Sequence, residues 1–117
     1  MPTFILHTNI KTIDQPTEEV LHHEISEIIA QCIGKSEDFV LTIFNPNTSM
    51  RFGAKAGISA YCEVKNVGVL SPETTNQIAG LITEILSTKL KILPKQLYIE
   101  FQESERHLWG WNGKTFA

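Results

Sequence analysis

The sequence predicts one α+β domain over residues 1–117, in which two β-α-β units form a four-stranded mixed sheet with both helices on one face. The main observation is a weak internal repeat at an offset of 57 residues, which places Leu21 on Ile78 and aligns the apolar stripes of two helical segments. At the same offset, residues 40–44 fall on residues 97–101. Both matches indicate a duplication, with pseudo-repeats at about 2–45 and 59–102 and a C-terminal tail at 103–117.

Each element is supported by its own local pattern. Apolar and β-branched runs predict strands at Thr3–Thr8, Val40–Asn45, Ser59–Val67 and Leu97–Gln102. Helices are predicted at Gln15–Ile33 and Pro72–Leu90, where apolar residues recur at i, i+4, i+7 and i+8, the spacing of one helix face.

Capping residues support the helix boundaries. Ser71 before Pro72 is a helix-start signal, and Gly34 followed by Lys35 is a helix-end signal. Asn45–Gly57 is predicted to be the loop between the halves. Each strand–helix–strand unit should make a parallel strand pair with a right-handed crossover.

Apolar residues are expected on both faces of the sheet, since Phe4 and Leu6 alternate with Ile5 along the first strand. Two helices cover only one face. The second face must therefore be buried against something else, and a chain of this length leaves other copies of itself as the natural partner. We expect an obligate homo-oligomer.

Composition narrows the functional classes. The chain is 42% hydrophobic and 20% charged, with a net charge of −3, which argues against a nucleic-acid-binding protein or one that binds anionic membranes. No apolar stretch is long enough to span a membrane, and Thr3–Leu6 is too short for a signal peptide. Cys32 and Cys62 lack metal-site spacing and are expected to be reduced thiols in a cytoplasmic protein.

Pro2 is the first candidate for chemistry. If Met1 is removed, Pro2 becomes an N-terminal secondary amine. An α-amino group titrates near ~7.7–8.0, so burial or a nearby cation would leave it neutral and able to act as a general base at neutral pH. The alternative is that Pro2 is simply a tolerated second residue.

Together with Pro2 and the duplication, several short motifs carry a family resemblance along essentially the whole chain. These are Thr8-Asn9, Gly34-Lys35, Phe52-Gly53, Val67-Gly68, Tyr98-Ile99 and the ending Gly110-Trp111-Asn112 with Thr115-Phe116-Ala117. The sequence resembles the macrophage migration inhibitory factor family of the tautomerase superfamily. Its ending looks closer to the microbial or plant members than to the vertebrate cytokine.

The resemblance implies a homotrimer whose three sheets form a barrel, with active sites at the subunit interfaces. It implies keto–enol tautomerisation of aromatic α-keto acids such as phenylpyruvate, and activity on D-dopachrome, without a cofactor or metal. An alternative within the family is a secreted, cytokine-like protein that binds a receptor and retains incidental catalysis. Members can be released without a signal peptide. A third alternative is dehalogenation or decarboxylation, but relatives with those activities carry further pocket arginines.

Five positions match the family's site. Pro2 matches the general base, Lys35 the cation that lowers the proline pKa and holds the substrate carboxylate, and Val67 the residue whose backbone N–H contacts substrate. Tyr98 matches a pocket tyrosine from the adjacent subunit, and Trp111 an aromatic residue at the pocket edge. Without the resemblance, Lys35 would be a solvent-facing cation at a helix end, and the other three would be strand-core or interface residues.

The sequence also departs from the family pattern. Glu100 stands where the cytokine has a pocket asparagine, and a carboxylate there would repel an anionic substrate unless it is paired, for instance with a lysine. Phe39 replaces a tyrosine, and Trp109 replaces a smaller residue. Cys62 stands without the first cysteine of the cytokine's Cys-x-x-Cys, so no thiol–disulfide activity of that type is expected.

Other residues are not assigned to the site. The adjacent pair His22 and His23 is expected on the solvated side of the first helix, and His107 is isolated. Arg51 and Arg106, the two arginines of the chain, cannot be placed in the pocket from the sequence.

Overall fold

The computed structural model describes the whole chain, residues 1–117. Its main elements are β1 (Thr3–Thr8), α1 (Gln15–Ile33), β2 (Leu41–Asn45), β3 (Ala60–Val67), α2 (Pro72–Leu90) and β4 (Leu97–Ser104). Three 3₁₀ turns accompany them: η1 (Glu37–Phe39), η2 (Pro94–Gln96) and η3 (Arg106–Leu108). Both helices have the predicted bounds, and β2, β3 and β4 differ from the predicted ranges by one or two residues at one end.

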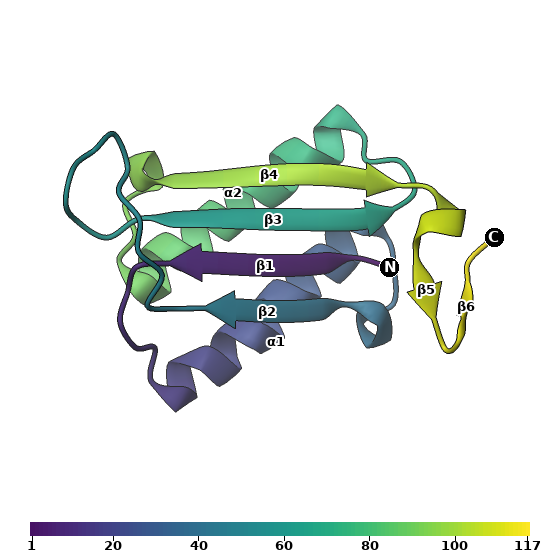
Figure 1. Cartoon of the computed structure of the whole chain (residues 1–117), viewed down its shortest axis with the longest axis horizontal. Helices are drawn as coiled ribbons and strands as arrows, with labels where there is room; N and C mark the ends of the chain where they lie inside the picture. The colour runs from purple at the N-terminus through teal and green to yellow at the C-terminus, as the bar shows by residue number, and fades with distance from the viewer.

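The strands form one mixed sheet in the order β2-β1-β3-β4. β1 and β2 are parallel, as are β3 and β4, and the two pairs meet through the antiparallel contact of β1 with β3. Figure 1 shows that β1 and β2 finish at the end of the sheet where β3 and β4 begin. This is the predicted arrangement of two joined β-α-β units.

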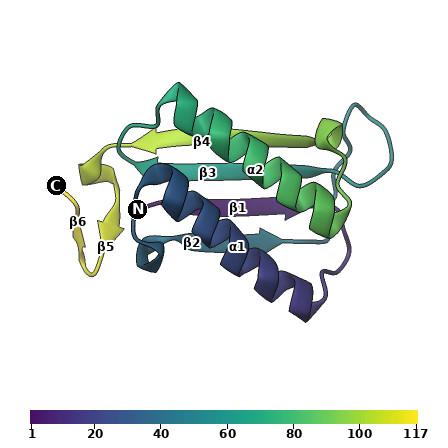
Figure 2. The ribbon, with the colours of Figure 1, turned by 180° about the vertical axis from the view of Figure 1, so that it is seen from behind.

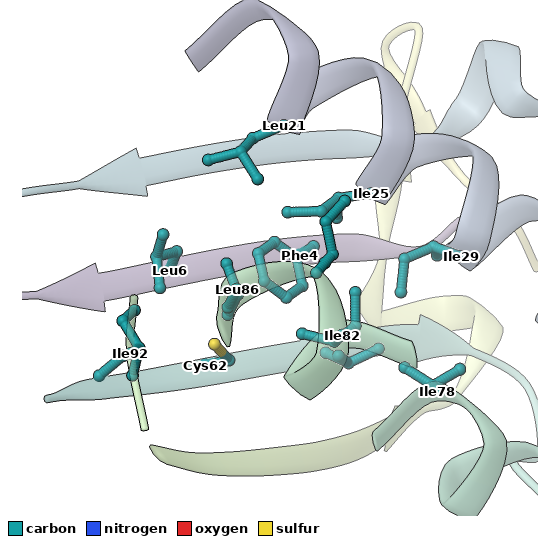
Figure 3. Close-up of a cluster of buried hydrophobic side chains, with 13 residues drawn as sticks. Phe4, Leu6, Leu21, Ile25, Ile29, Cys62, Ile78, Ile82, Leu86 and Ile92 are labelled. Atoms are coloured by element: carbon teal, nitrogen blue, oxygen red, sulfur yellow. The ribbon is translucent and has the colours of Figure 1, made fainter. Parts of the chain in front are cut away.

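Both helices cover the same face of the sheet, as predicted, and leave the other face open (Figure 2). The core lies between the two layers. Phe4 and Leu6 from β1 are fully buried against isoleucines of the helices, among them Ile25 and Ile82 (Figure 3). The helix residues of this core are those of the two superposed stripes, so burial of apolar surface is what holds the helices on the sheet.

Local capping fixes the helix ends. The Ser71 hydroxyl accepts a hydrogen bond from the Thr74 N–H at 3.1 Å at the start of α2, and Asp14 does the same for Thr17 at the start of α1. Gly34 ends α1 in the left-handed conformation, with φ of 77°, which a residue without Cβ adopts at little cost. The predicted caps at Ser71 and Gly34 are therefore confirmed.

A C-terminal hairpin was not predicted. β5 (Gly110–Trp111) pairs with β6 (Lys114–Thr115) through a turn at Asn112 and Gly113, both with positive φ. Asn-Gly is a strong signal for such a two-residue turn, and it was available in the sequence. The hairpin lies beside the N-terminus, beyond the end of the sheet (Figure 1).

The open face of the sheet is less apolar than expected. Ile5, Leu41 and Ile43 give the β1–β2 half the predicted apolar character, but β3 and β4 present polar side chains. These are Tyr61, Glu63, Lys65, Tyr98, Glu100 and Gln102. The expectation was wrong for these two strands because their apolar residues alternate strictly onto the helix-covered face.

The two adjacent histidines of α1 also differ from the prediction. The His22 ring lies 4.0 Å from the Phe44 ring between centroids, and its Nδ1 lies 2.6 Å from the Thr42 hydroxyl. His23 is 72% exposed and faces solvent as expected. The prediction was wrong only for His22, because successive residues on a helix point about 100° apart and one of the two reaches the edge strand.

None of the helices has the length and apolarity that a membrane crossing requires.

Candidate active site

The chain begins at a hollow between the sheet and the C-terminal hairpin. This cavity, of about 340 Å³, is lined by Met1 and Thr3, by residues 38–41, and by residues 109–111. Six of its nine lining residues are hydrophobic. An apolar hollow of this size fits the ring of a small aromatic molecule.

Pro2 lies between two residues that line this hollow, Met1 and Thr3, and is held firmly in place. Its side chain is buried, and its carbonyl accepts a hydrogen bond of 3.1 Å from the Leu41 N–H. The next residue, Thr3, already pairs with Leu41 on one side and with Lys65 on the other. The backbone at Pro2 is therefore fixed by the two strands that flank β1.

The terminal amine is electrostatically perturbed. In the chain that carries Met1, the pKa of this amine lies below its ordinary value of 8.0, first because burial disfavours the charged form and second because the positive charge of Lys35 repels it. Lys35 is placed there by the turn at Gly34, and its N–H bonds to the Ala30 carbonyl at 3.0 Å. The helix end thus presents a cation to the N-terminus.

Val67 lies at the same end of the sheet. It is the last residue of β3, it is 8% exposed, and it pairs with Ser104. The antiparallel register of Thr3 with Lys65, continued past the end of β1, brings Met1 to the level of Val67. The register therefore brings Val67 close to Pro2, and Lys35 lies near the terminal amine, but the cavity lining includes none of these three residues.

Aromatic side chains form one wall of the cavity. Trp111 meets Phe39 edge to face, with 5.5 Å between ring centroids, and stacks on Phe116 at 6.3 Å. The tail is tied back by Arg106, whose Nε donates to the Phe116 carbonyl at 2.8 Å. Trp111 remains 53% exposed, so one face of this wall is open to a ligand or to another chain.

Asp38 also lines the cavity and was not singled out from the sequence. It lies in the 3₁₀ turn η1, where its N–H donates to the Ser36 hydroxyl. An acid in a short turn just after a helix carries no signal of its own in the sequence. Its presence adds a negative charge to the cavity lining, and Lys35 lies three residues earlier in the same connection.

Tyr98 is not at this cavity. It pairs with Tyr61 at the start of β4, whereas Thr3 pairs with Lys65. At about 3.3 Å per residue, the step from Tyr61 to Lys65 separates Tyr98 from Thr3 by roughly 13 Å along the sheet. Tyr98 is 66% exposed and packs on Phe52, 4.7 Å away between ring centroids. Within one protomer, the predicted residues therefore form two groups at opposite ends.

Glu100 has a partner on the open face. The Tyr61 hydroxyl donates a hydrogen bond to its carboxylate, from the neighbouring strand. On the same face, His7 Nε2 lies 2.8 Å from the Glu63 carboxylate and Lys65 Nζ lies 3.7 Å from it. The carboxylates of this face are thus held in place, but the partner of Glu100 is a tyrosine and not the lysine that the sequence suggested.

The two cysteines are free thiols. Cys62 is fully buried in the core, and Cys32 is partly buried. Burial raises the pKa of both thiols, which disfavours the reactive thiolate. No group of three or more His, Cys, Asp or Glu side chains is arranged to hold a metal ion.

The fold and the site are those of a small α+β protein with a duplicated β-α-β sheet and a proline at position 2 next to an apolar hollow, and comparison with known proteins shows its family. The family model described as macrophage migration inhibitory factor matches residues 1–117. The chain belongs to the macrophage migration inhibitory factor family. This family includes tautomerases and cytokine-like members.

Individual relatives cover the chain from end to end. It is 31% identical to a macrophage migration inhibitory factor homologue of Brugia malayi and 29% identical to the macrophage migration inhibitory factor of Meriones unguiculatus, over 100% of each chain. A solved homologue from Prochlorococcus marinus has a TM-score of 0.91 and 28% identity, with 98% of this chain and 99% of that chain covered. These three identities are nearly equal, so a closer likeness to microbial or plant members stays a prediction.

Proposed function

We propose that the chain, after removal of Met1, is a cofactor-free keto–enol tautomerase that acts on aromatic α-keto acids of the phenylpyruvate type, and on D-dopachrome, with Pro2 as the general base. The observation that carries this proposal is the terminal amine at an apolar cavity, with its pKa lowered by burial and by Lys35. Removal of Met1 would place the new amine at Pro2, which is itself buried, so both causes would continue to favour the neutral base.

The reaction needs a base at the carbon next to the ketone and stabilisation of the enolate oxygen. Pro2 would take a proton from that carbon and return it to the oxygen end of the enol system. Lys35 would bind the substrate carboxylate, and the backbone N–H of Val67 would donate a hydrogen bond to the substrate. Trp111 and Phe39 would hold the aromatic ring, since apolar walls favour such a group.

The complete site would be shared between subunits of a homotrimer. Tyr98 lies at the end of the protomer opposite Pro2, and it is exposed. Packing of three sheets through their open faces would close a barrel and bring Tyr98 of one copy to the cavity of the next. The apolar β1–β2 half of the open face and the half-exposed Trp111 supply surface for such contacts.

Glu100 would then lie near the same shared site, because it follows Tyr98 by two residues on the same face of β4. Its carboxylate would disfavour a second negative charge on the substrate beside it. The hydrogen bond from Tyr61 holds the carboxylate on the sheet, which supports monoanionic keto acids as the substrate class.

The test is ketonisation of phenylpyruvate enol, followed by the loss of enol absorbance, with three matched proteins. These are the Met1-trimmed parent, the Pro2→Gly variant and a form that retains Met1. We expect activity in the parent and a loss of at least roughly a hundredfold in the other two, the size of a general-base contribution. Light scattering should show the same oligomer in all three.

Two outcomes would contradict the proposal. One is a trimmed, correctly assembled parent without activity, which would favour receptor binding by a cytokine-like protein as the function. The other is full activity in Pro2→Gly, which would assign the base elsewhere. Mass spectrometry of each protein establishes whether Met1 is present.

A further inference from the structure

A buried polar side chain near Pro2 has no hydrogen-bond partner for its oxygen. Asn66 on β3 is 1% exposed, and its side-chain oxygen Oδ1 accepts no hydrogen bond within the chain. An unpaired buried acceptor costs free energy, so nearly all such groups in folded proteins are paired. The groups around Asn66 should therefore include a donor.

The register of the sheet places Asn66 opposite Pro2. Thr3 pairs with Lys65 in the antiparallel contact of β1 with β3, so the next step along both strands brings Pro2 to the level of Asn66. Because side chains alternate between the two faces, both residues lie on the helix-covered face together with the buried Phe4. Residues opposite each other on one face have Cβ atoms about 4.5–5.5 Å apart, which brings Pro2 within reach of the asparagine side chain.

The surroundings of Asn66 also favour one orientation of its amide. Asn66 pairs with Glu103 on β4, whose Oε2 accepts a hydrogen bond from the Leu70 N–H at 2.6 Å. A carboxylate held on this side attracts the amide NH₂ group rather than the amide oxygen. Nδ2 lies 3.9 Å from the position that a Cβ on Gly68 would occupy, so the NH₂ group lies towards the turn after β3. Oδ1 is then left for the side of Pro2.

Removal of Met1 would create the missing donor. While Met1 is attached, the Pro2 nitrogen belongs to a peptide bond and carries no hydrogen. As the first residue, Pro2 has a secondary amine with one N–H and one lone pair, and it gains a second N–H when it is protonated. The unpaired oxygen of Asn66 therefore matches a donor that only the trimmed chain has.

We propose that Asn66 is a positioning residue for the trimmed N-terminus: its Oδ1 accepts a hydrogen bond from the Pro2 N–H and directs the lone pair of the amine towards the cavity. The inference rests on the proposed function, in which this lone pair takes the substrate proton. That proton binds at the lone pair, and the N–H bonded to Asn66 stays where it is. The hydrogen bond strengthens when the amine becomes positively charged, so it favours proton uptake and opposes the repulsion by Lys35.

Other charged groups around the amine form the background of any pH measurement. Lys65 lies on the open face, and β2 has no charged residue. The remaining groups are Lys35 and Asp38 after α1, Glu103 on β4, Lys114 on the hairpin, and Tyr98 and Glu100 of the next copy in the proposed trimer. All of these are unchanged in substitutions at position 66, so a change in the pKa of the amine would come from Asn66.

The first test is titration of the Pro2 amine in the trimmed protein, followed by the ¹⁵N chemical shift of Pro2. Asn66→Leu removes the acceptor at similar volume and should lower the pKa of the amine, because the charged form loses a hydrogen bond. Asn66→Asp keeps an acceptor oxygen and should not lower it. Val64→Ala truncates a fully buried residue on the same face of β3 and should leave this pKa unchanged. With phenylpyruvate, kcat in Asn66→Leu should fall roughly tenfold or more.

A second test does not depend on activity. Urea denaturation at one protein concentration compares Asn66→Leu in the trimmed chain and in the chain that retains Met1. In the trimmed chain the substitution should lower the free energy of unfolding, because a hydrogen bond is lost. With Met1 present it should be neutral or stabilising, because an unpaired buried acceptor is removed. Val64→Ala should lower the free energy of unfolding equally in both forms.

Two results would overturn the proposal: a pKa of the amine that Asn66→Leu leaves unchanged, and equal stability changes with and without Met1. An inactive parent in which Asn66→Leu still lowers the pKa of the amine would contradict the tautomerase function and support the hydrogen bond. An active parent without that change would contradict the hydrogen bond alone.

Discussion

Tyr61 on β3 donates a hydrogen bond to Glu100 on β4, across the face of the sheet that the helices leave open. This bond is the largest cause that raises the pKa of Tyr61 from 10 to about 12, with smaller contributions from desolvation and from the negative charges of Glu100 and Glu63. The pair gives the polar half of the open face a defined geometry.

The hydrogen bond between Tyr61 and Glu100 predicts how Tyr61 titrates at alkaline pH. Glu100→Gln should lower the pKa of Tyr61 towards 10, as measured by phenolate absorbance. Because folding favours the protonated phenol, the stability gained from this pair is present below pH 10 and is lost as the pH rises from 10 to about 12. Tyr61→Phe should remove the late transition, whereas Tyr98→Phe should retain it; the opposite pattern would contradict the assignment.

Lys35 should help to set the pKa of the terminal amine. In Lys35→Gln the pKa of this amine should rise, because a repelling positive charge is removed. The acidic limb of the activity profile should then move to higher pH, and the KM for phenylpyruvate should rise roughly tenfold or more with the loss of a charged hydrogen bond. Lys91→Gln removes the same charge at the far end of the sheet and should leave both quantities unchanged.

Subunit mixing tests whether the site is shared. Tyr98 and Pro2 lie at opposite ends of one protomer, so each site of a trimer would take these residues from different copies. Pro2→Gly and Tyr98→Ala should each be weak alone, and oligomers reassembled from both should regain a substantial part of the parent activity. Mixtures no more active than the average of the two parents would indicate that Tyr98 acts elsewhere.

Substitution of the two neighbouring histidines of α1 should change the free energy of unfolding by different amounts. His22→Ala removes a ring stacked on Phe44 and a hydrogen bond to Thr42, and should lower the free energy of unfolding by about 1 kcal/mol. His23→Ala should change it by less than about 0.5 kcal/mol, as is usual for an exposed side chain. Urea denaturation at one fixed protein concentration measures both.

The core between the layers should be sensitive to truncation. Ile82 is fully buried among the helix and strand residues of the core, so Ile82→Ala should cost about 2–5 kcal/mol through lost burial and a residual cavity. Val69 is 85% exposed, and Val69→Ala serves as the matched control with little expected change. Similar midpoints in urea for the two variants would contradict this account of the core.

Much of the fold was predictable because the elements have strong local signals. The apolar stripes, the Ser71 cap and Gly34 fix both helices within the bounds observed. The hairpin at Asn112 and Gly113 carried an equally local signal and was missed. Asp38 could not have been found, since its place in the cavity lining follows from how η1 packs beside the hairpin.

The sequence by itself determined the two β-α-β units, the helix-covered core and the family, because periodicity and caps act over a few residues and repeat along the chain. Only the tertiary structure decided which residues meet. It set the N-terminal amine of Met1 at an apolar cavity near Lys35 and placed Tyr98 at the other end of the sheet. It also paired Glu100 with Tyr61. Strand order and register bring distant segments together, and neither is written in the local pattern of any one strand.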